Sequence, residues 1–116
     1  MKPVTWIIAG ALLGAGCGGA AAPTATRTEA RSSLRSAEAV GAEQAPRASY
    51  YLELAREQAQ QGDEWVEDGK MDRARLAYER AAADAELAIA LANHAEARGE
   101  AEQVREHIQD MREQHL

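Results

Sequence analysis

The stretch "ARLAYERAAADAELAIALANHA", residues 74–95, decides the fold of this chain. Small apolar residues recur in it at alternating steps of four and three, the spacing that places side chains on one face of an α-helix. Because methyl groups let two backbones approach closely, this seam predicts tight packing against a second helix rather than a bulky core. The seam is made of Ala74, Tyr78, Ala81, Ala85, Ala88, Ala92 and Ala95.

The preceding sequence supplies two helices for this seam to contact. Residues 28 to 44 carry apolar side chains at helical spacing, and Gly41 stands near the end of that pattern. Pro46 suits the first turn of a second helix. That helix is expected to end at Gly69, which fits a left-handed cap. The sequence therefore predicts that this second helix and the helix that carries the seam are antiparallel and are joined by a tight turn at Gly69.

The third helix is expected to start at Asp72, as its cap, and to run without a proline towards Gln114. At 1.5 Å per residue it would be roughly 65 Å long. The predicted fold class is all-α: an antiparallel helical hairpin with a long C-terminal helix, completed by a short first helix into a small three-helix bundle. The bundle is assigned to residues 28–96 and a projecting C-terminal helix to residues 97–116.

Beyond residue 96 the apolar pattern moves to a different face of this helix. The new stripe repeats at steps of four and three and comprises Ala97, Ala101, Val104, Ile108 and Met111. We expect Val104, Ile108 and Met111 to bind a partner, either a second copy of the chain or another envelope protein, because an apolar stripe on an unsupported helix gains by being covered. The alternative is a polar tail that frays.

The N-terminal segment has the layout of a secretory signal. Lys2 gives a positive start, an apolar run extends from Val4 to Leu13, and glycine and alanine follow. The run is shorter than the roughly 20 residues that span a bilayer. The stretch "LLGAGCGGAAA", residues 12–22, then holds the only cysteine of the chain, Cys17.

A cysteine after small residues at this place resembles the processing box of bacterial lipoproteins, in which a peptidase cuts before a lipid-bearing cysteine. The resemblance implies a signal peptide in residues 1–16 and an acylated Cys17. Residues 17–26 have no charge and no apolar period, so they are expected to form a flexible tether. The box usually has leucine three residues before the cysteine, where this chain has Gly14. Gly18 replaces the aspartate that commonly retains such proteins in the inner membrane, which implies the outer membrane, facing the periplasm.

The alternative for this segment is ordinary signal cleavage within Gly19-Ala20-Ala21. That cleavage would remove Cys17 and release a soluble secreted protein. The two alternatives differ in whether a lipid bilayer is a partner of the chain.

The helical region resembles a family of short, Ala-rich bacterial envelope lipoproteins classed as a domain of unknown function, whose region sometimes precedes OmpA-like domains. The shared features are Ala45-Pro46 opening a helix, Ala55-Arg56, the turn at Gly69 and "ERAAADAELAIA", residues 79–90. This resemblance implies an envelope role and carries over no catalytic residue. A single hairpin also resembles the tetratricopeptide repeat, through Gly62, Trp65, Gly69, Ala74, Tyr78 and Ala81.

The charged residues give no sign of nucleic-acid binding or catalysis. The net charge is −6, with acidic and basic residues interleaved, so no basic patch exists for a phosphate backbone. Asp63 and its acidic neighbours lack the ligand order of a calcium loop, and no two histidines have the four-residue spacing of a helical metal site. We expect a non-catalytic adaptor without a cofactor. The alternative is an enzyme or a small metal- or ligand-binding periplasmic protein.

Overall fold

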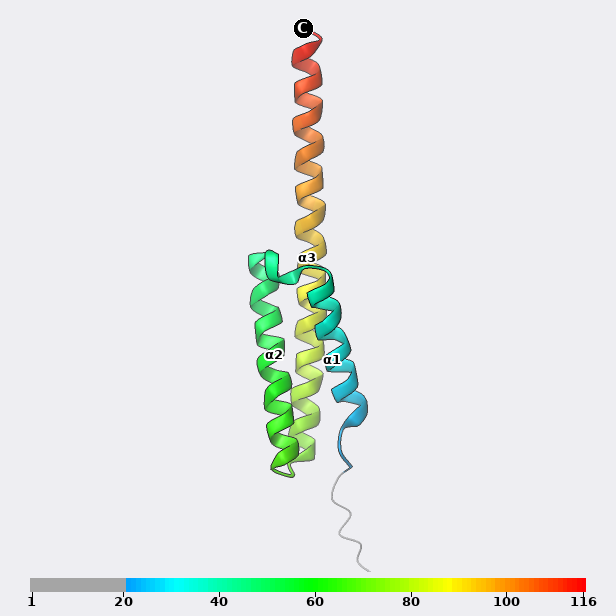
Figure 1. Ribbon diagram of the computed structural model, residues 1–116, viewed down its shortest axis with the longest axis vertical. Coiled ribbons are helices and arrows are strands. Elements are labelled where there is room, and N and C mark those ends of the chain that lie inside the picture. Colours follow the sequence, from blue (N-terminus) through cyan, green and yellow to red (C-terminus); the bar gives the residue numbers. More distant parts are fainter. Residues whose placement is uncertain (1–20) are drawn as a thin grey trace, which may run out of the picture.

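The computed structural model describes residues 21–116 and contains three α-helices and one short 3-10 helix (Figure 1). The sequence-based prediction of an all-α hairpin with a long C-terminal helix and a short first helix is confirmed. α1 and α3 run in one direction and α2 in the other. In chain order the elements are α1 (Thr24–Ala39), η1 (Ala42–Gln44), α2 (Pro46–Glu67) and α3 (Met71–Gln114).

Helix α1 lies earlier in the chain than residues 28 to 44, where the sequence placed it. It begins right after Pro23, whose carbonyl oxygen accepts hydrogen bonds from the Arg27 amide and the Thr26 hydroxyl, both at 3.0 Å. Residues 24–26, expected in the tether, are therefore helical. The helix ends at Ala39 because Gly41 adopts a left-handed φ of 75°, and the chain then forms η1.

The two ends of helix α2 are determined by a proline at its start and a left-handed glycine after its end. Ala45 is extended (φ −103°, ψ 119°), as a residue before proline prefers, and Pro46 opens the helix. At the other end Gly69 has a φ of 73°. Its amide donates to the Val66 oxygen at 3.0 Å, and the Lys70 amide donates to the Trp65 oxygen at 2.8 Å. These two bonds form a Schellman cap, which turns the chain into α3.

Helix α3 begins without the expected aspartate cap. Lys70 occupies the cap position, no side chain caps the helix, and Asp72 lies inside the first turn. Its carboxylate there still interacts favourably with the helix dipole. The helix has 44 residues, so it is roughly 66 Å long, and only its first half has neighbours.

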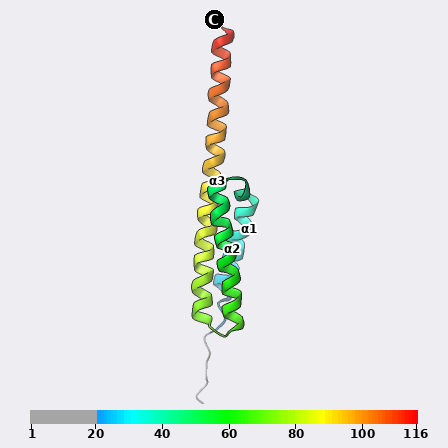
Figure 2. The ribbon, with the colours of Figure 1, turned by 90° about the vertical axis from the view of Figure 1, so that its left-hand side faces the viewer.

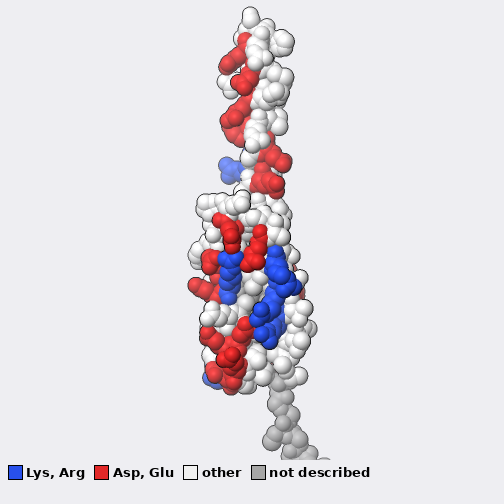
Figure 3. All heavy atoms as spheres, in the orientation of Figure 1, with Lys and Arg blue, Asp and Glu red and all other residues white. Residues whose placement is uncertain are grey.

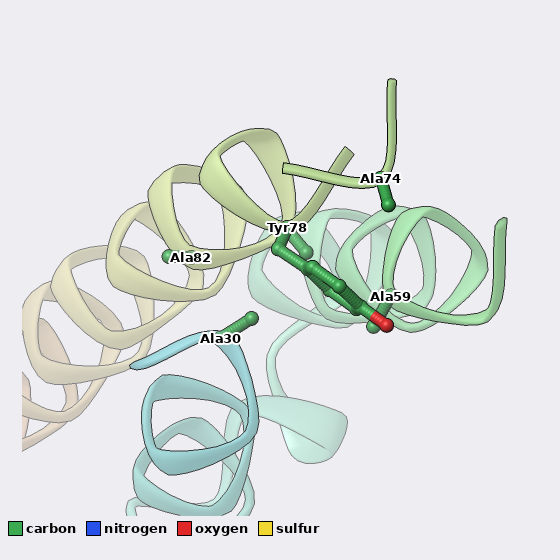
Figure 4. Close-up of a cluster of buried hydrophobic side chains, with 6 residues drawn as sticks. Ala30, Ala59, Ala74, Tyr78 and Ala82 are labelled. Carbon is green, nitrogen blue, oxygen red and sulfur yellow. The ribbon is translucent and has the colours of Figure 1, made fainter. Parts of the chain in front are cut away.

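The core is made almost entirely of alanine. Apart from Leu52 and Tyr78, every buried apolar residue in the described part of the chain is an alanine. One cluster surrounds Tyr78 (Figure 4) and a second surrounds Leu52. The predicted seam is buried from Ala74 to Ala92, whereas Ala95, assigned to it from the sequence, is exposed. Helices α1 and α2 both lie on one side of α3 (Figure 2).

The aromatic ring of Tyr78 lies directly against the backbone of α2. A Cβ atom added at Gly62 would lie 2.6 Å from Cε1 of Tyr78, closer than any real van der Waals contact. Only glycine at position 62 leaves room for this ring. The close approach of α2 and α3 near their turn thus depends on one glycine and one tyrosine.

Candidate functional site

The candidate site lies on the half of α3 that projects beyond the bundle. Every residue from 93 to 116 is exposed. The side chains expected to bind a partner are 57% exposed at Val104, 39% at Ile108 and 42% at Met111. All three belong to one continuous helix, so the structure places them on a single face, as their spacing requires.

This apolar stripe faces away from the helices of the bundle. At about 100° per residue, its direction differs from that of the buried alanines of α3 by roughly 130°. The two apolar faces of α3 therefore serve different neighbours. One is covered by α1 and α2, and no part of residues 21–116 covers the other.

Charged side chains flank the stripe asymmetrically. Arginines follow one flank at seven-residue intervals, at positions 98, 105 and 112, and Glu100 lies on the opposite flank. Further acidic residues occupy the back of the helix, where red side chains follow one side of the projecting segment in Figure 3. Arg105 lies 3.6 Å from Glu102 within the helix. Within residues 97–116, the stripe thus has a basic flank with three arginines and an opposite flank whose one acidic residue is Glu100.

A network centred on Asp63 connects all three helices within the bundle. Its carboxylate accepts a hydrogen bond from the Tyr78 hydroxyl at 2.5 Å and lies 3.1 Å from Nε of Arg27 and 2.8 Å from Nη2 of Arg31. Burial of the phenol, and next its bond to Asp63, raise the pKa of Tyr78 to about 12. The network braces α1 against the hairpin.

A second network lies near the opposite end of the bundle. The Arg56 guanidinium on α2 contacts Glu38 of α1 at 2.7 Å, Glu43 of η1 at 2.5 Å, and Glu53 on its own helix. These hydrogen bonds, foremost the one that Arg56 donates to Glu43, raise the pKa of Arg56 above its usual range. The three carboxylates converge on this arginine, which holds the α1–η1–α2 corner together.

Neither network has the composition of a binding centre. Asp63, part of the acidic turn sequence, is neutralised by two arginines. Across residues 21–116, no three histidine, cysteine or acidic side chains are placed to hold a metal ion. His94, His107 and His115 are exposed along α3. Cys17, the expected lipidation site, lies outside the described residues.

Sequence reasoning missed the network around Asp63. Arg27 and Arg31 stand four residues apart, which places them on one face of α1. That spacing was a usable signal for a carboxylate partner. The partner itself could not be read from the sequence, because it lies on another helix 32 positions beyond Arg31.

None of the helices in residues 21–116 combines the length and the apolarity that crossing a bilayer requires.

A family model described as "Domain of unknown function (DUF4398)" matches residues 25–104. The match covers most of the chain, so the chain belongs to this family, which confirms the resemblance to a domain of unknown function. The matched segment includes nearly all of α1, the rest of the bundle and the start of the projecting segment up to Val104. Comparison with curated proteins and with solved structures finds no match.

Proposed function

We propose that this member of the DUF4398 family is a lipoprotein of the bacterial cell envelope, anchored through acylated Cys17. It acts as a non-catalytic adaptor that presents one helical surface to a protein partner. The partner binds the stripe of Val104, Ile108 and Met111. Such tethering acts by raising the local concentration of the partner at the membrane.

The observation that carries this proposal is the exposed apolar stripe at the far end of α3. Helix α1 begins at the end of the bundle that holds the α2–α3 turn, opposite the tip of α3 (Figure 1). An anchor preceding residue 21 would therefore hold the bundle near the membrane and direct the stripe away from it. Exposed contiguous apolar surface of this kind marks interaction sites.

The resemblance to the lipoprotein processing box supports the anchor. Each buried methylene contributes about 0.8 kcal/mol, so one acyl chain holds a protein only marginally, whereas two or more hold it stably. A cysteine carrying a diacylglyceryl group and an N-acyl chain would hold the chain firmly. Gly18 in place of aspartate favours the outer membrane.

The anchor is tested by metabolic labelling with a fatty-acid probe in a bacterial host that processes lipoproteins. The wild-type chain should incorporate the probe and sediment with the membrane fraction, whereas Cys17→Ser should lose both properties. A matched variant, Gly18→Asp, should keep the label and move to the inner membrane. An unlabelled wild-type chain whose N-terminus lies within residues 19–22 would refute the anchor and establish ordinary secretion.

The adaptor surface is tested by photo-crosslinking in the same cells. A photoreactive residue at position 104 or 108 should give a defined crosslinked product, because both positions face the partner. The same residue at position 106, on the back of α3, should give none. Equal crosslinking from the front and the back of the helix would contradict a specific surface.

A further inference from the structure

The apolar stripe of the projecting segment continues down the packed half of α3, on the face turned away from α1 and α2. There it includes Leu76 and Leu87, which are 47% and 40% exposed although they belong to the bundle. Their direction differs from that of the buried alanines by roughly 160° at 100° per residue. We call this face the outer seam: Leu76, Ala83, Leu87, Ala90, Ala97, Ala101, Val104, Ile108 and Met111, all exposed.

The outer seam has the repeat of a coiled coil. Its positions alternate in steps of four and three from Leu76 to Met111, with Arg80 and His94 in the two remaining places. This run corresponds to about five heptads, and three to four suffice as the signature of a coiled coil. A strict seven-residue repeat drifts by about 20° per heptad on a straight helix, which a left-handed supercoil corrects.

The distribution of side-chain sizes also indicates that the outer seam is covered. The fully buried residues of α3 are alanines and Tyr78, with Ile89 and Leu91 partly buried beside them. Leu87, Val104 and Ile108, by contrast, lie on the exposed face. A chain that used only its bundle would bury the larger residues, because burial of apolar area is the main gain in packing. The outer seam therefore needs an occupant of its own.

We propose that the occupant is a second copy of this chain, packed in parallel and in register along the outer seam, so that this copy is the protein partner of the apolar stripe in the projecting segment. In a parallel coiled coil, the residue just before a core position such as Ala101 faces a residue of the other helix whose number is higher by five. Glu100 then faces Arg105 of the second copy, and the symmetric pair forms as well. In the projecting segment the basic flank of each copy thus meets Glu100 of the other in this orientation, whereas nearer the α2–α3 turn Glu79 faces Asp84 of the second copy at a cost in stability.

The antiparallel orientation is disfavoured by the same side chains. In an antiparallel pair like flanks meet, so Arg98, Arg105 and Arg112 of one helix would face the arginines of the other. Like charges at such short range destabilise the pair. The parallel orientation also brings both residues numbered 21 to the same end, as two anchors in one membrane require; that last point rests on the proposed function.

Two polar residues moderate the strength of this dimer. Arg80 and His94 occupy core positions of the outer seam. Polar residues at such positions fix the register at a cost in stability. The dimer should therefore dissociate on dilution, and its register should be unique.

The orientation is tested by disulfide crosslinking of the full chain carrying Cys17→Ser. Single cysteines at Leu87→Cys and at Val104→Cys should both give covalent dimers on mild oxidation, because like residues meet across a parallel seam within disulfide reach. Glu106→Cys, on the back of α3, should remain monomeric. An antiparallel pair can join like residues at one place only, so crosslinking at a single position, or at none, overturns the proposal.

The charge pairing is tested by sedimentation equilibrium of the purified full chain with Cys17→Ser. Glu100→Arg should weaken the dimer about tenfold, and the double variant Glu100→Arg with Arg105→Glu should restore it. Glu106→Arg has the same net charge as Glu100→Arg and should leave dimerisation unchanged. A monomer at all concentrations, or no rescue by the double variant, refutes the parallel pair. Since this chain carries no lipid, failure of the anchor leaves these results unaffected.

Discussion

The contact between Gly62 and the ring of Tyr78 leads to the sharpest prediction about stability. In Gly62→Ala the new methyl carbon would lie 2.6, 2.8 and 2.9 Å from three ring carbons, whereas carbon atoms in contact prefer about 3.5–4.0 Å. The ring or α2 must therefore shift by about 1 Å. The ring cannot move freely, because its hydroxyl donates a hydrogen bond to Asp63 and the ring is buried in a cluster of alanines.

Two opposing effects determine the size of the change. Overpacking a close-packed core costs about 1–3 kcal/mol, and replacing glycine by alanine inside a helix gains about 1 kcal/mol. Because three ring carbons lie within 3.0 Å of the new methyl carbon, the cost belongs to the upper part of that range, and we expect Gly62→Ala to lose about 1–2 kcal/mol of the free energy of unfolding. In a domain of this size, each kcal/mol lowers Tm by about 4–8 °C.

The assay is urea unfolding of the full chain followed by circular dichroism, with two controls. Gly99→Ala changes a helical glycine whose added Cβ would have no neighbour within 4 Å, so it should not destabilise the chain. In a Tyr78→Leu background the ring is absent, and Gly62→Ala should no longer be destabilising, which yields a coupling free energy between the two positions. A Gly62→Ala chain as stable as the wild type would refute the predicted clash.

Two further predictions concern the core. Ala88 is fully buried, so Ala88→Leu should cost about 1–3 kcal/mol in urea unfolding, whereas Ala95→Leu, at an exposed position of α3 outside the outer seam, should cost nothing; equal effects would mean that Ala88 is not packed. The pKa of Tyr78 is raised from 10 to about 12, so its contribution to stability should be intact below pH 10 and disappear as the pH rises towards 12. Tyr78→Phe should flatten that part of the stability profile, and parallel wild-type and variant profiles would exclude this phenol as the cause.

The parts of the fold that the sequence predicted depend on local signals. The alanine seam of α3 is a periodicity within one helix, and the turn at Gly69 requires only the left-handed conformation that glycine adopts readily. The start of α1 was misplaced because threonines at positions 24, 26 and 28 are indifferent helix formers. Pro23, which opens that helix, was assigned to the tether. The prediction that Asp72 caps α3 was wrong, because the helix starts two residues earlier than this cap requires and Lys70 occupies the cap position.

The parts that the sequence did not predict depend on contacts between helices. Asp63 could be recognised as the partner of Arg27 and Arg31 only once α1 lay against α2. The sequence predicted the outer seam only from Ala97 onwards. Its continuation through Leu87 was missed because the alanine seam has the same period and lies on the same stretch of helix. Hydrophobicity alone would have placed the larger residues inside. Only the arrangement of α1 and α2 shows which side of α3 is covered.

The unbroken helix beyond Ala92 sets the distance between the bundle and the tip of α3, because in a continuous helix the number of residues fixes the length. From Ala92, the last buried residue, to Gln114 at its end, α3 advances roughly 33 Å. Adding or deleting seven residues in this segment would move the tip by roughly 10 Å and keep its side chains pointing almost the same way. Adding five would turn the tip by roughly 140°. We therefore expect related chains to differ in the length of this segment by multiples of seven residues, wherever selection acts on both the distance of the tip from the bundle and the direction of its side chains.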